Sequence, residues 1–169
     1  MQVTVKPNED RLTAFHTALM NSGLFLYVPK NVVIKQPITA YYVQDSTQPA
    51  DFIHHVLVVA EQNSEFSYLE NLQTAGDHKN LANVVVEVIA KDNSHVHFSA
   101  VDAFGKSVTT YLNRRGHLMR DARIDWALGS INDGNIIGDF DSDLVGAGSH
   151  AETKVVAIST GKQIQGIDT

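Results

Sequence analysis

The chain has 169 residues, which fits one domain over residues 1–169 with a buried core, and its apolar content of 43% is ordinary for a globular protein. Its 13 Lys and Arg residues against 19 Asp and Glu residues give a net charge of −6, which argues against a nucleic-acid partner because phosphate binding needs a basic face. No cysteine is present, which excludes disulfides, cysteine-based zinc sites and thiolate ligation of a metal cluster by these residues.

The first ten residues lack the basic segment followed by an apolar segment that marks a signal peptide. The chain also has no run of 18 apolar residues, so we expect no membrane span. The expected location is therefore the cytoplasm.

The first predicted element is a short helix at about residues 9–20. Asn8 is placed to act as its N-cap, and two acidic residues follow in the first turn, where the helix dipole favours them. Leu12, Phe15 and Leu19 recur at spacings of three and four and form one apolar stripe. Gly23 is the predicted C-terminal stop. We expect the stripe to be packing surface and the helix to cover the first coil of whatever follows it.

Beyond residue 23 the pattern changes to short segments rich in β-branched and aromatic residues, which predict strands. These segments are 25–28, 52–59, 66–69, 84–89, 96–101, 108–112, 124–128 and 155–158. No second helical pattern separates them, and no glycine-rich phosphate loop follows any of them. A βαβ sheet and a nucleotide-binding fold are therefore disfavoured.

A weak internal repeat runs through the strand region. A turn residue precedes a short strand at Asn31, Asn63, Asn93, Asp121 and Gly148, with intervals of 32, 30, 28 and 27 residues. Asn, Asp and Gly tolerate the left-handed backbone geometry of turns, so their recurrence has a physical reason. A period near thirty is typical of successive coils of a solenoid. A jelly roll or another antiparallel sandwich is the alternative.

His95 and His97 are the sharpest candidates for a metal site, because residues two apart in a strand share a face. The same pair opens the metal motif of cupins, but no Glu follows at the spacing that the motif requires. We expect Val96 and Phe98 to point inward and both imidazoles to lie on the outer face, and we assign no metal. The adjacent His54 and His55 must lie on opposite faces and cannot chelate together.

Two further segments carry charges that could have a function. Residues 139–143 read Asp-Phe-Asp-Ser-Asp and imitate the start of a calcium loop, but the Gly and Glu that an EF-hand needs are absent, so we expect a solvated turn. Arg114 and Arg115 precede Gly116 and could bind an anion or pair with carboxylates on a neighbouring coil. No nucleophile elbow and no other catalytic arrangement is visible, so we assign no catalytic residue.

Residues 23–32, which read GLFLYVPKNV, resemble the Gly–hydrophobic–Phe–hydrophobic–Tyr–Val–Pro–Lys–small–Val signature of the SufB/SufD family. As in that family, an amphipathic helix precedes the signature. Weaker matches follow in the family's order at residues 54–70, 83–102, 111–116 and 144–159. The resemblance thus covers most of the chain.

The resemblance implies an all-β fold, a right-handed parallel β-helix over about residues 24–169, followed in the family by a small helical C-terminal domain that this chain lacks. It implies a scaffold subunit of the SUF iron–sulfur cluster assembly complex and not an enzyme. SufB and SufD pair through their β-helices, and each C-terminal domain docks a SufC-type ATPase. The cluster belongs to the complex, and no cofactor is expected on this chain itself.

Two departures from the family pattern favour a SufD-like role. SufB-type chains carry Gln and Trp where this chain has Asp102 and Phe104, and no cysteine is present. The chain also ends before the family's last coils, which leads us to expect a homodimer of the chain alone, formed through the strand edge at residues 155–158.

Two alternatives from other classes remain at this point. A β-helical carbohydrate-active enzyme such as a polysaccharide lyase would need a cluster on one outer face, for which Arg114, Arg115 and Asp125 are available. A cupin-like metalloprotein would need a barrel with His95 and His97 inside it.

Overall fold

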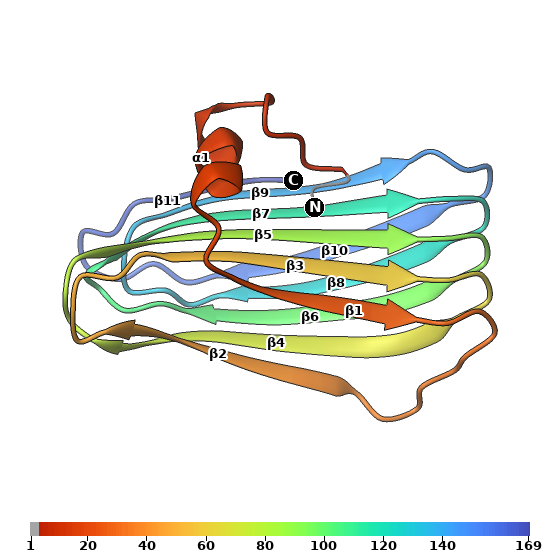
Figure 1. The fold of residues 1–169 in the computed structure, drawn as a ribbon, viewed down its shortest axis with the longest axis horizontal. Helices are drawn as coiled ribbons and strands as arrows, with labels where there is room; N and C mark the ends of the chain where they lie inside the picture. The colour runs from red at the N-terminus through yellow and green to blue at the C-terminus, as the bar shows by residue number, and fades with distance from the viewer. Residues whose placement is uncertain (1–3) are drawn as a thin grey trace.

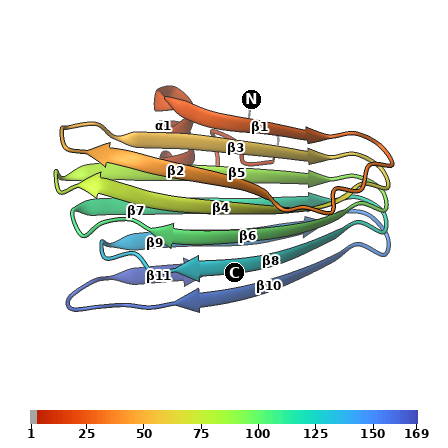
Figure 2. The same ribbon diagram turned by 90° about the horizontal axis from the view of Figure 1, so that it is seen from below.

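The computed structural model describes residues 4–169, and in this part of the chain one helix and eleven strands form a parallel β-solenoid (Figure 1). The chain passes alternately between two stacked sheets, so each coil contributes one strand to each sheet (Figure 2). The prediction of an all-β parallel β-helix with one short N-terminal helix is confirmed.

The two sheets are called sheet A and sheet B. Sheet A contains, in spatial order, β1 (Ser22–Val28), β3 (Phe52–Ala60), β5 (Asn80–Ala90), β7 (Val108–Leu118), β9 (Ile136–Leu144) and β11 (Gln165–Asp168). Sheet B contains, also in spatial order along the solenoid, β2 (Ile38–Ser46), β4 (Glu65–Gly76), β6 (His95–Ala103), β8 (Arg123–Ser130) and β10 (His150–Ala157). All neighbouring strands are parallel.

The core lies between the two sheets and follows from the alternation of side chains along each strand. In β6, Val96, Phe98 and Ala100 are buried, while the residues between them are partly exposed. Contacts between tilted aromatic rings continue across coils, from Tyr68 through Phe98 to Trp126, with centroid distances of 5.2 and 4.8 Å. Each coil thus covers the apolar face that its neighbour cannot bury alone.

The predicted turn residues lie at one corner of every coil. Asn31, Asn63, Asn93 and Asp121 have φ of 62°, 59°, 56° and 55°, and Gly148 has φ of 74°. The side-chain amides of Asn63 and Asn93 each donate a hydrogen bond to the amide oxygen one coil earlier, at 2.8 and 2.9 Å. The repeat therefore marks left-handed turns joined by an asparagine ladder, as the turn chemistry predicted.

The helix α1 (Arg11–Leu19) is confirmed, but the predicted N-cap and the predicted C-terminal stop are wrong. Its N-cap is Asp10 and not Asn8, because the Asp10 carboxylate accepts hydrogen bonds from the backbone of Leu12 and Thr13 at 2.6 and 2.8 Å. Gly23 is not a helix stop, because it lies inside β1. The carbonyl oxygen of His55 lies so close to Gly23 that a Cβ atom would not fit there.

The helix also packs in a way that its apolar stripe did not predict. Thr13 and His16 are its buried residues, whereas Leu19 is 52% exposed. The helix lies on the outer face of sheet A, where His16 contacts β3 and β5, and does not cover the first coil (Figure 1). Hydrogen bonds, and not apolar contact alone, set its position.

Three strands were missed by sequence reasoning, namely β2, β9 and β11. The segment Asp139–Asp143, for which we expected a solvated turn, lies within β9. Its alternating Asp residues have little strand propensity, and the backbone is held in a strand by the parallel pairing with β7. Within residues 4–169, no helix is long and apolar enough to cross a bilayer.

Candidate functional site

His95 and His97 lie on the outer face of β6, with Val96 and Phe98 buried beneath them, so the predicted orientation is confirmed. Their side chains are 29% and 42% exposed, and their ring centroids are 4.0 Å apart. The cupin-like alternative is contradicted, because it requires a barrel with both imidazoles inside it.

Two carboxylates join these imidazoles from neighbouring coils. Asp125 of β8 places Oδ2 2.8 Å from His95 Nε2 and 3.2 Å from His97 Nδ1. Glu65 of β4 lies opposite His95 in the sheet register, and Glu65, His95 and His97 each offer one ligand atom within 4.8 Å of the others. We call these four residues the outer histidine cluster.

The carboxylate of Asp125 is held in its ionised form. Partial burial raises its pKa, but hydrogen bonds from His95 and Arg123 outweigh this and lower the pKa below its usual value. Arg123 Nε lies 2.8 Å from Asp125 Oδ1, so the two carboxylate oxygens have different partners. Sequence reasoning found the two imidazoles but placed neither carboxylate beside them: Glu65 was not singled out, and Asp125 was considered only for the lyase alternative. Both are about thirty residues from His95, and only the coil register brings them together.

Arg114 points into the interior of the solenoid, where its guanidinium pairs with carboxylates from two other strands. Its Nη2 lies 2.7 Å from Glu70 of β4 and 2.6 Å from Asp102 of β6, and all three side chains are fully buried. Burial raises the pKa of Glu70, and the Arg114 charge acts in the opposite direction. Of the two roles considered for Arg114, pairing with carboxylates of neighbouring coils is therefore the one that the structure shows. We call these three residues the inner arginine cluster.

Arg115 points to the opposite side, the outer face of sheet A, and fixes the N-terminal segment. It lies 2.8 Å from Glu9 and 3.6 Å from Asp141. Asp139, which is close to both Arg115 and Asp141, has a pKa raised to about 6 by burial and by the neighbouring Asp141 charge.

The three residues considered for the lyase alternative do not form one cluster. That alternative required Arg114, Arg115 and Asp125 on one outer face, but they lie in the interior, on the outer face of sheet A and on the outer face of sheet B, respectively.

His54 and His55 lie on opposite faces of β3, as expected. His54 points inward and stacks on Phe52 at a centroid distance of 4.9 Å, and burial lowers its pKa to about 4. His55 points outward beneath α1, with its ring nitrogens 3.0 Å from His16 Nε2 and 3.1 Å from Glu87 Oε1. No local pattern indicates this buried network, because its members come from the helix and two strands.

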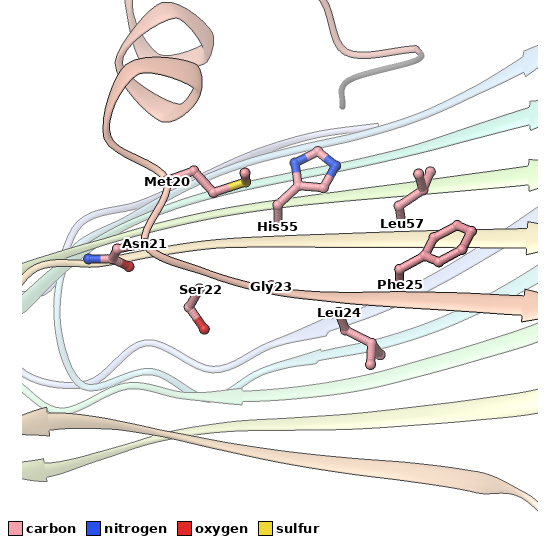
Figure 3. Close-up of a pocket in the computed structure, with 8 residues that line it drawn as sticks. All are labelled: Met20, Asn21, Ser22, Gly23, Leu24, Phe25, His55 and Leu57. Atoms are coloured by element: carbon pink, nitrogen blue, oxygen red, sulfur yellow. The ribbon is translucent and has the colours of Figure 1, made fainter.

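An apolar groove of about 660 Å³ lies beside His55, at the junction of α1 and β1 (Figure 3). Met20, Phe25 and Leu57 line it together with the imidazole of His55. Since both nitrogens of His55 already face other side chains, that imidazole is not positioned for proton transfer to a molecule in the groove.

Comparison with known proteins matches residues 42–169 to the SufBD core domain of the SUF system of iron–sulfur cluster assembly and residues 1–40 to the SufBD protein N-terminal region. The chain belongs to the SufBD family. Among curated relatives, the Bacillus subtilis "Iron-sulfur cluster assembly protein SufD" is 44% identical over 171 residues, covering 100% of this chain and 39% of that protein.

A Staphylococcus epidermidis "Iron-sulfur cluster assembly SufBD family protein" is 23% identical over 158 residues, covering 93% of this chain and 34% of that protein. The chain therefore spans well under half the length of these relatives. Among solved structures, the comparison found no significant match.

In this SufBD-family chain, the two positions at which the resemblance departs from SufB both lie inside the solenoid. Asp102 pairs with Arg114, and Phe104 is buried with its ring 6.3 Å from that of Phe52. Both residues thus take part in holding the coils together.

Proposed function

We propose that this chain forms the β-helix core of a SufD-like scaffold subunit of the SUF complex, which acts by pairing with a SufB-type subunit and not by catalysis. The observation that carries the proposal is the 44% identity to Bacillus subtilis SufD over the whole chain. The departures at Asp102 and Phe104, together with the absence of cysteine, support the SufD-like role over the SufB role.

The exposed apolar side chains at β10 support a role in pairing. Val156, in β10, and Ile158, which follows it, are 63% and 53% exposed. Exposed apolar side chains that lie close together mark surfaces that recruit other chains. We therefore assign this surface to pairing with the SufB-type subunit and, for the chain alone, to a closed homodimer.

Co-expression with the SufB-type subunit of the same genome tests the pairing. Size-exclusion chromatography with light scattering should show a complex of the two chains, and a dimer for residues 1–169 alone. Val156→Asp should abolish both associations. Val43→Asp is the matched control, because Val43 is 59% exposed on β2, at the opposite edge of the same sheet, and this variant should still pair. A chain that stays monomeric on concentration and does not copurify with the SufB-type subunit would refute the proposal.

The cluster and the ATPase belong, in this proposal, to the rest of the complex. Anaerobic reconstitution of residues 1–169 with iron and sulfide should give no charge-transfer absorbance, because the chain has no thiolate to hold a cluster. A pull-down with the SufC-type ATPase should be negative for residues 1–169 and positive for the full-length subunit. The first assignment would be contradicted by a stoichiometric cluster that is lost in the His95→Ala/His97→Ala variant. The second would be contradicted by tight binding of the ATPase to residues 1–169.

A further inference from the structure

We propose that the outer histidine cluster binds a divalent transition-metal ion of the zinc type, with Glu65, His95 and His97 as ligands and Asp125 as the residue that orients both imidazoles. This site goes beyond the scaffold function and does not depend on it. Sequence reasoning assigned no metal here because it found two imidazoles and no third ligand, and the coil register supplies that ligand.

The geometry is close to that of a metal site. The ligand atoms of Glu65, His95 and His97 lie within 4.8 Å of one another. Around a tetrahedral zinc ion with bonds of about 2.0–2.2 Å, ligand atoms are roughly 3.4 Å apart. The remaining movement is small, and it is available because Glu65 is exposed and both imidazoles are partly exposed.

The donor set selects the class of ion. Two imidazoles and one carboxylate suit zinc and its neighbours in the first transition series, whereas magnesium and calcium prefer oxygen donors alone. Three protein ligands leave a fourth position for water or for a group from a bound partner. The absence of thiolate directs the site to a single ion and not to an iron–sulfur cluster.

Asp125 faces one nitrogen of each imidazole. Its Oδ2 atom is hydrogen-bonded to His95 Nε2 at 2.8 Å and lies 3.2 Å from His97 Nδ1, so the second nitrogen of each ring is the one left for an ion. A metal-ligating histidine usually has its second nitrogen bonded to such a carboxylate. Arg123, at 2.8 Å from the other oxygen, holds Asp125 in place.

The sheet makes the arrangement rigid. Glu65, His95 and Asp125 come from three successive parallel strands whose register is fixed by the core beneath them. His95 and His97 are two apart in one strand and must share its outer face. The backbone therefore positions the ligands before any ion arrives, which lowers the cost of ordering them.

The experiment is a titration of residues 1–169 with zinc chloride, by calorimetry and by competition with a chromophoric chelator. We expect one equivalent of zinc per chain. His95→Ala and His97→Ala should each weaken binding at least tenfold, and Glu65→Gln should weaken it as well. Asp125→Asn should weaken binding by about 10–100-fold without removing a ligand.

His117→Ala is the control, because it also removes one partly exposed histidine but from β7 in the opposite sheet, and it should bind zinc as the unchanged chain does. Cobalt(II) gives an independent readout, since the visible absorption of a tetrahedral site should be present in the unchanged chain and absent in His95→Ala/His97→Ala. Circular dichroism confirms that each variant is folded. Stoichiometry and affinity that are unchanged in the double variant, or a chain that takes up no zinc, would overturn the proposal.

Discussion

The inner arginine cluster and the outer histidine cluster both use side chains of β4 and β6, on opposite faces of these strands, and each adds one strand of its own, β7 for Arg114 and β8 for Asp125. Glu70 and Asp102 point inward, whereas Glu65 and His95 point outward. Inside, charges have no access to water and depend entirely on one another. Outside, the same kinds of groups retain solvent as an alternative partner and remain available to an ion. Burial, more than residue type, decides whether a charged cluster is committed to the fold.

Removing the arginine from the inner cluster should produce the largest effect. Arg114→Met leaves two buried carboxylates without their counter-charge, and we expect it to lower the free energy of unfolding by about 3–5 kcal/mol. Urea unfolding at pH 7 measures the loss. The triple variant Arg114→Met/Glu70→Met/Asp102→Leu is the control and should recover most of the stability, because an apolar interior needs no pairing. If Arg114→Met is as stable as the unchanged chain, the buried carboxylates do not depend on the arginine, and burial does not distinguish the two clusters.

The buried His54 should make the fold sensitive to acid. Its pKa of about 4 in the folded chain lies below the unfolded value near 6.5, because burial disfavours the charged form. The contribution is fully present above pH 6.5 and is lost as the pH falls toward 4, by up to about 3 kcal/mol.

His54→Phe removes the titrating group and keeps the stacking on Phe52. Urea unfolding between pH 7 and 4 should therefore show a shallower loss for this variant than for the parent. His16, whose pKa is also about 4 because of burial, remains in the variant and maintains part of the dependence. Identical pH profiles for the two proteins would show that folding does not lower the pKa of His54.

A smaller effect is expected at the asparagine ladder, which is neither in the interior nor fully exposed to solvent. In Asn63→Ala, the alanine must adopt φ of 59°, which is unfavourable for a residue with a Cβ atom and no turn-forming side chain. The variant also loses two hydrogen bonds of the asparagine ladder. We expect the free energy of unfolding to fall by about 1–2 kcal/mol. Asn63→Gly removes the same bonds but tolerates the backbone, so it should cost less. Thermal unfolding of both variants separates the two contributions, and an equal loss would assign all of it to the ladder.

The outer cluster should contribute least to stability. In metal-free buffer, His95→Ala/His97→Ala should change the free energy of unfolding by less than about 0.5 kcal/mol, because exposed ion pairs contribute little. Urea unfolding with a chelator present measures this directly. A loss comparable to that of Arg114→Met would mean that exposure does not distinguish the two clusters.

The sequence predicted the solenoid because its strongest signals are local. Asn63 and Gly148 mark turns through their own backbone preferences, and the β-branched strands mark the core. The strands β9 and β11 escaped because their Asp and Gly residues have little strand propensity and pairing with the preceding coil holds them extended. The strand β2 was missed although its Ile, Tyr and Val residues favour a strand. Likewise His95 and His97 could be found, since they are neighbours in sequence, but Glu65 and Asp125 depend on a register that no local pattern reveals.

The two ends of the coils differ in how regularly the chain turns. At the asparagine corner, the sheet A to sheet B turns span residues 29–37, 61–64, 91–94, 119–122 and 145–149, and the three central turns have the same length. The opposite corner uses residues 47–51, 77–79, 104–107, 131–135 and 158–164, and its turns vary in length from one coil to the next (Figure 1). The three central asparagine turns keep the coils in phase, so a change in chain length there would shift a strand by one residue and turn its core side chains outward. The opposite corner already varies in length without disturbing the pairing. It is the corner at which the chain can accept insertions, and therefore the natural place to introduce an epitope or a fluorophore-binding peptide without altering either sheet.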